Sequence, residues 1–127
     1  MSPKLTFTIG SAITFFFSAA FFIAPEFFTM TAFPAAKGFA IDVGITMRYV
    51  LAATIFGVSY LLFQARSLER EGDQKKTLLG AAIGFTIVWA TIVYATIFRE
   101  LSGSIPPIIA TGLMAVLNWL SWAKIKI

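Results

Sequence analysis

The sequence predicts an all-α protein, a four-helix transmembrane bundle in which residues 1–127 form one integral membrane domain. Four apolar runs carry this prediction, at approximately 5–24, 43–63, 78–98 and 105–123. A helix needs about 20 apolar residues to cross the hydrocarbon of a bilayer. Apolar residues make up 58% of the chain and charged residues 13%, whereas soluble domains have about 45–50% and 25%.

The distribution of lysine and arginine predicts the orientation. Seven of the ten basic residues fall on the side that four spans would give to the N-terminus, the central loop and the C-terminus. Cytoplasmic loops are enriched in lysine and arginine, so we expect an N-in, C-in topology. The alternative, a cleaved signal peptide, is disfavoured because Pro25 and Glu26 follow the first run, where small residues would be expected.

The first run begins after Pro3 and ends near Pro25. Small or hydroxyl-bearing residues recur on one of its faces every four positions: Gly10, Thr14 and Ser18. Small residues let helix backbones approach closely in lipid. We therefore expect this stripe to be the contact with the other helices.

The connection over 25–42 is unusually apolar for a loop. It predicts a segment that lies in the membrane interface, folds back over the bundle or meets a partner. Its large apolar residues are the expected partner-packing set: Phe27, Phe28, Met30, Phe33 and Phe39. Asp42 is placed to cap the second long helix.

The second and third runs also carry small residues at packing spacing: Ala53, Gly57, Gly80 and Gly84. The last two form a GxxxG pair, which fits packing within the chain and dimerisation equally. Gly72 is expected to end one helix and Asp73 to cap the next.

The fourth run opens after a short turn, with Ser104 as the expected cap and two prolines in the first turn. Trp119 and Trp122 precede Lys124. Aromatic and then basic residues at the end of a span are typical of membrane anchors.

The sequence offers no catalytic, cofactor-binding or metal-binding set. Cysteine and histidine are both absent, which excludes disulfides, thiolate chemistry and imidazole ligands. No carboxylate or lysine lies near the middle of a span. Proton-coupled exporters usually need such a group, and no nucleic-acid-binding motif is present.

Arg48 is a candidate functional residue because it is a charged side chain within a predicted span. It lies about five residues into the second predicted helix, about 8 Å from its start. Glu26 and Glu100 end other elements on the same side, so we expect the three residues to form a polar cluster at the outer end. A structural ion pair is favoured over an anion or headgroup site.

Several short stretches resemble the DoxX-like group of small bacterial membrane proteins. The stretches are Pro25-Glu26, Met47-Arg48-Tyr49, Arg66 and the turn over 99–107. The resemblance implies a four-helix bundle with an arginine near the outer end of the second helix, in a bacterial inner or intracytoplasmic membrane. DoxX relatives are associated with partner oxidoreductases, but no redox motif in this chain supports that association.

The expected function is that of a non-catalytic accessory or assembly subunit. It would pack against larger membrane-protein subunits and against lipids or pigments, since its surface is rich in phenylalanine. The alternative is a homo-oligomeric channel or facilitator for a small solute, which would need a continuous polar face.

Overall fold

The computed structural model describes residues 2–126, which form five helices and no strand. The helices are α1 (Pro3–Ile23), α2 (Pro25–Ala32), α3 (Phe39–Ala65), α4 (Glu71–Phe98) and α5 (Ile105–Lys124). All except α2 are long and apolar enough to span a membrane. This confirms the predicted four-helix bundle of an integral membrane protein.

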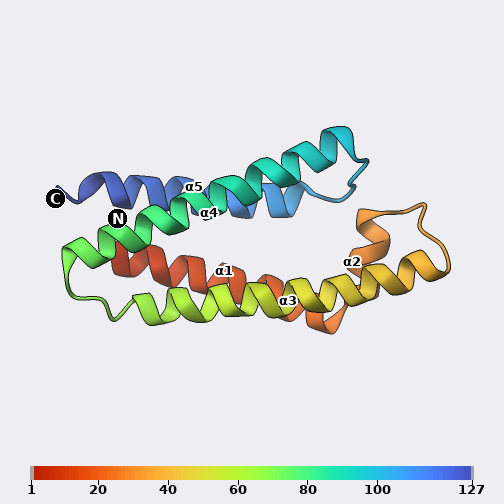
Figure 1. Ribbon diagram of the computed structural model, residues 1–127, viewed down its shortest axis with the longest axis horizontal. Coiled ribbons are helices and arrows are strands. Elements are labelled where there is room, and N and C mark those ends of the chain that lie inside the picture. Colours follow the sequence, from red (N-terminus) through yellow and green to blue (C-terminus); the bar gives the residue numbers. More distant parts are fainter. Residues whose placement is uncertain (1, 127) are drawn as a thin grey trace.

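The four long helices form two antiparallel pairs. α1 packs along α3, and α4 packs along α5, while α1 and α5 make a smaller contact between the pairs (Figure 1). Both chain ends and the α3–α4 turn lie at the same end of the bundle (Figure 1). We call it the basal end, and the opposite end, with α2 and the α4–α5 loop, the distal end.

Hydroxyl groups fasten α1 to α3. Ser18 Oγ donates a hydrogen bond of 2.8 Å to the carbonyl of Ala52, and Ser59 Oγ donates one of 2.8 Å to the carbonyl of Ser11. Each bond satisfies a buried hydroxyl while crossing from one helix to the other. Such bonds hold helices together in lipid, where apolar side chains gain little by leaving the tails.

The two pairs are joined at the basal end by a small core. Phe7 of α1 and Leu78 of α4 are almost completely buried in it, and Ile125, just after α5, packs on the same cluster. The hydroxyls of Thr6 and Ser121 form a buried hydrogen bond between α1 and α5.

The distal end is joined by α2, a helix within the stretch 25–42, which the sequence predicts to be a connection. Pro25 occupies its first position, where the missing N–H costs nothing. α2 folds back over the bundle and packs on α3, and the carbonyl of Ala32 accepts a 2.9 Å hydrogen bond from the N–H of Ser102. It therefore links the α1–α3 pair to the α4–α5 loop.

Two helices begin earlier than predicted. α3 starts at Phe39 and α4 at Glu71, so Asp42 and Asp73 lie in first turns and are not caps, and Gly72 lies within α4. These predictions were wrong because the helices continue beyond the apolar runs. Acidic side chains in a first turn are stabilised there by the helix dipole.

α5 begins after Ser104, as expected, but the Ser104 hydroxyl caps no backbone N–H. It is paired instead with the hydroxyl of Thr96 at 2.7 Å.

Candidate functional site

The predicted outer cluster does not form. Among residues 2–126, no ion pair joins Arg48 to Glu26 or Glu100, and both carboxylates are exposed. Arg48 Nη2 donates a long hydrogen bond of 3.5 Å to the carbonyl of Phe28, and its guanidinium lies 5.0 Å from the Phe21 ring centre. Because α3 begins at Phe39, Arg48 lies about 14 Å along the helix, not about 8 Å.

The predicted packing residues divide into two groups. Gly10, Thr14 and Ser18 are buried, and Gly10 approaches the side chain of Leu62 of α3. Ala53, Gly57, Gly80 and Gly84 are exposed, so they do not pack against another helix of this chain, and for Gly80 and Gly84 association with a second chain stays a prediction. Spacing reveals that small residues share a helix face, but not which helix that face contacts. Adjacent residues of a helix point about 100° apart, and here Ala52, not Ala53, faces α1.

The exposed small residues belong to two long uncovered faces. One, the α3 free face, lies opposite the contact with α1 and consists of Thr46, Val50, Ala53, Gly57, Tyr60 and Gln64. The other, the α4 free face, lies opposite the contact with α5 and consists of Gly80, Gly84, Ile87, Thr91 and Phe98. A Cβ atom added at Gly57, Gly80 or Gly84 would meet nothing within 4 Å.

The predicted partner-packing residues are mostly exposed. Phe27, Met30, Phe33 and Phe39 all present their side chains to the surface at the distal end. Phe28 differs, because its ring packs edge-on against Phe21 at 5.0 Å between centres.

The two tryptophans attach α5 to α4. Trp119 Nε1 donates a 3.0 Å hydrogen bond to Thr86 Oγ1 of α4, and the Trp122 ring lies 5.0 Å from the ammonium group of Lys75. Their sequence positions indicated only membrane anchoring. The contacts with α4 depend on the pairing of the two helices, which that pattern does not reveal.

Most threonines inside the spans do not offer free hydroxyls. The hydroxyl donates to the carbonyl four residues earlier in the same helix at each of these positions: Thr14, Thr54, Thr86, Thr91, Thr96 and Thr111. This back-bonding is usual for threonine in membrane helices. Within residues 2–126, these side chains do not form a polar row suited to a pore.

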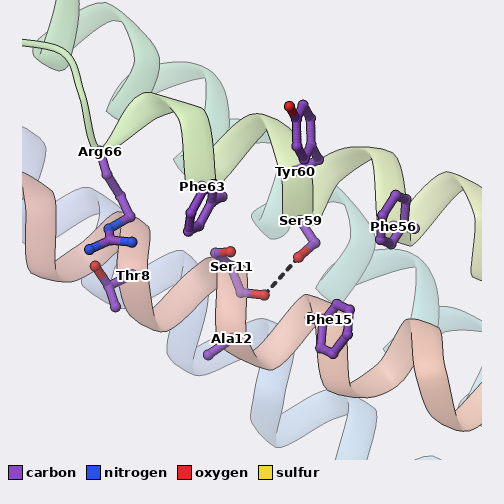
Figure 2. A pocket seen from close by; sticks show the side chains of 9 residues that line it. All are labelled: Thr8, Ser11, Ala12, Phe15, Phe56, Ser59, Tyr60, Phe63 and Arg66. Carbon is purple, nitrogen blue, oxygen red and sulfur yellow. Dashed lines mark hydrogen bonds between the residues drawn. The ribbon is translucent and has the colours of Figure 1, made fainter.

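A groove of about 430 Å³ runs between α1 and α3 in the basal half (Figure 2). We call it the basal groove, and its lining residues are Thr8, Ser11, Ala12, Phe15, Phe56, Ser59, Tyr60, Phe63 and Arg66. Arg66 directly follows the last residue of α3, and its guanidinium points across the groove toward Thr8 (Figure 2). The groove thus has a cationic end and an aromatic end.

Arg66 is incompletely paired. Its guanidinium carbon lies 5.1 Å from the centre of the Phe63 ring, and its Nε is buried without a hydrogen-bond partner. From the sequence, Arg66 is only one of the basic residues of the central loop and one of the residues that carry the family resemblance. An arginine at the end of an apolar helix was the available signal, because such side chains extend toward the interface.

A second groove, of about 580 Å³, separates α1 from α5, and its walls are entirely apolar. The described residues include no group of three side chains suited to hold a metal ion. Comparison of the chain with protein-family models, with curated proteins and with solved structures finds no match.

Proposed function

We propose that the protein is a non-catalytic accessory subunit of a bacterial inner or intracytoplasmic membrane. It associates laterally with larger membrane-protein subunits, and its exposed aromatic side chains pack against surrounding lipids or pigments. The observation that supports this most is the pair of free faces on α3 and α4, whose glycines have no neighbour within the chain.

The energetic reason is that helices in lipid are held together by close packing and hydrogen bonds, not by the burial of apolar side chains. Large apolar side chains gain little by moving from lipid to protein, so helices associate where small residues permit close backbone contact. Glycine inside a helix costs about 0.5–1 kcal/mol relative to alanine. Three uncovered glycines on two helices therefore fit contact with helices from another chain better than contact with lipid alone.

The channel alternative receives less support. A pore needs polar groups that are free to contact the solute, and the intramembrane threonine hydroxyls are engaged with their own helices. An accessory subunit needs only outward-facing packing surfaces, which the free faces supply.

The test is co-purification from native membranes in a mild detergent, followed by native mass spectrometry. Gly57→Leu and Gly84→Leu should abolish stoichiometric association with the larger subunits, because leucine keeps the partner backbone at a distance. The fold should survive, since both positions are exposed and nothing lies within 4 Å of a Cβ atom added at either one.

Ala90→Leu is the matched control, because Ala90 is an exposed small residue of α4 that is turned about 100° from the Gly80–Gly84 stripe. It should leave the association unchanged. Retention of the partner by both glycine variants would refute the proposal, and a purely homo-oligomeric species in the wild type would favour the channel.

A further inference from the structure

We infer that the basal groove binds one phospholipid molecule, with its anionic phosphate on Arg66 and an acyl chain along the aromatic wall. The inference goes beyond the proposed function: the groove is lined by α1, α3 and Arg66, and it shares only Tyr60 with the α3 free face. It lies away from the α4 free face.

Arg66 supplies the headgroup end. Among residues 2–126 it has no carboxylate partner, and its buried Nε has no acceptor. A guanidinium presents several donors in a planar fork that matches two phosphate oxygens. A buried N–H without an acceptor is costly, so a phosphate oxygen is a chemically suitable partner for this group.

The rest of the groove is suited to a hydrocarbon chain. Phe15, Phe56 and Phe63 form its walls (Figure 2). The Ser59 hydroxyl does not offer a free donor there, because it already donates to the Ser11 carbonyl. Phe56 precedes Arg66 by ten residues, about 15 Å along the helix. The groove therefore runs from the basal end toward the middle of the bundle, as a phospholipid does in its own leaflet.

The charge of the basal end favours an anionic lipid. This end carries seven basic residues, Lys4, Arg66, Arg70, Lys75, Lys76, Lys124 and Lys126, against three acidic ones, Glu69, Glu71 and Asp73. The distal end carries three of each sign, so the whole net charge of +4 lies at the basal end. Basic residues near a membrane surface attract anionic lipids by about 1 kcal/mol each.

A free phosphate ion could also meet a guanidinium, but it would leave the aromatic part of the groove unused. The two sources make different demands on Phe56. A lipid chain contacts this ring, whereas an ion at Arg66 lies about 15 Å away from it.

The experiment measures retention of phosphatidylglycerol and of phosphatidylcholine by the purified full-length protein, using native mass spectrometry after exchange into each lipid. Arg66→Gln should lower phosphatidylglycerol retention about fivefold and leave phosphatidylcholine retention nearly unchanged. Arg66→Lys, which keeps the charge but loses the fork, should lower it less. Phe56→Ala should weaken both lipids equally, since it acts on the chain.

Arg70→Gln is the matched control, because Arg70 is an exposed arginine of the same end that lies outside the groove. Equal losses in the Arg66→Gln and Arg70→Gln variants would reduce the effect to diffuse surface charge and overturn the inference. A different result would be that inorganic phosphate displaces the lipid while Phe56→Ala leaves the retention of both lipids unchanged. That result would assign the site to a free ion and would also overturn the inference.

Discussion

At the scale of single residues, the two arginines of the α3 region show how position along a helix decides what a guanidinium does. Arg48 lies within the span and rests on the Phe21 ring and the Phe28 carbonyl. Arg66 ends the helix beside a groove and keeps an unpaired N–H. An unpaired charge is costly in hydrocarbon, so the deeper arginine is packed by aromatic and backbone groups, whereas the shallower one has room for a ligand.

Gly44 is the glycine whose replacement should harm the fold most clearly. A Cβ there would lie 2.2 Å from Thr29 Cγ2, and Thr29 is held in place because its hydroxyl bonds the Pro25 carbonyl. Gly44→Ala should destabilise the protein by about 1–3 kcal/mol, as overpacking does, which unfolding in a denaturing detergent would measure.

Two comparisons make the Gly44 prediction specific. Gly57→Ala should raise stability by about 0.5–1 kcal/mol, because alanine is the better helix residue and its added Cβ meets nothing within 4 Å. Thr29→Ser removes the clashing methyl and should restore part of the stability lost in Gly44→Ala. A Gly44→Ala variant as stable as the wild type would show that α2 does not pack on α3 as described.

At the scale of elements, the sequence predicted the four spans but not their ends or α2. Hydropathy marks the part of a helix that lipid surrounds, so the polar first turn of α4 left no signal. Pro25 ends α1 and begins α2 at once, and a proline reads equally as a stop or as a first-turn residue. The contact of α2 with Ser102 depends on a residue seventy positions away, which no local pattern encodes.

The serine bonds between α1 and α3 should be worth more than the threonine bonds within single helices. Ser18→Ala and Ser59→Ala should each cost about 0.6 kcal/mol, the average for hydrogen bonds between membrane helices, and at most about 1.7 kcal/mol. Thr91→Ala should cost little, because Thr91 bonds only its own helix. Unfolding measurements in bicelles would compare the three, and equal losses would mean that the inter-helix bonds add nothing.

At the scale of the whole molecule, the charge asymmetry predicts which end faces the cytoplasm. The absence of cysteine allows single labels: Ser67→Cys in the exposed α3–α4 turn and Ala35→Cys in the exposed loop after α2. A membrane-impermeant maleimide applied to intact cells should label the Ala35→Cys variant alone. Labelling of the Ser67→Cys variant alone would show that the topology is the reverse of the predicted one. The inferred lipid would then lie in the outer leaflet.

The candidate site was less predictable than the fold because it depends on which helices pair with one another. Periodicity identifies which residues share a helix face, as it did for Gly10, Thr14 and Ser18, but it does not say which face meets which helix. The basal groove arises from the pairing of α1 with α3, so Arg66 acquires Thr8 as a neighbour only in the folded chain.

The division into two helix pairs also bears on how the chain is made. Synthesis delivers the N-terminal part first, and α1, α2 and α3 make most of their contacts with one another. The basal groove is lined by this first half alone, so its walls are complete once Arg66 has entered the bilayer. We therefore expect the α4–α5 hairpin to dock onto the first three helices, and the Thr6–Ser121 and Ala32–Ser102 bonds to form last.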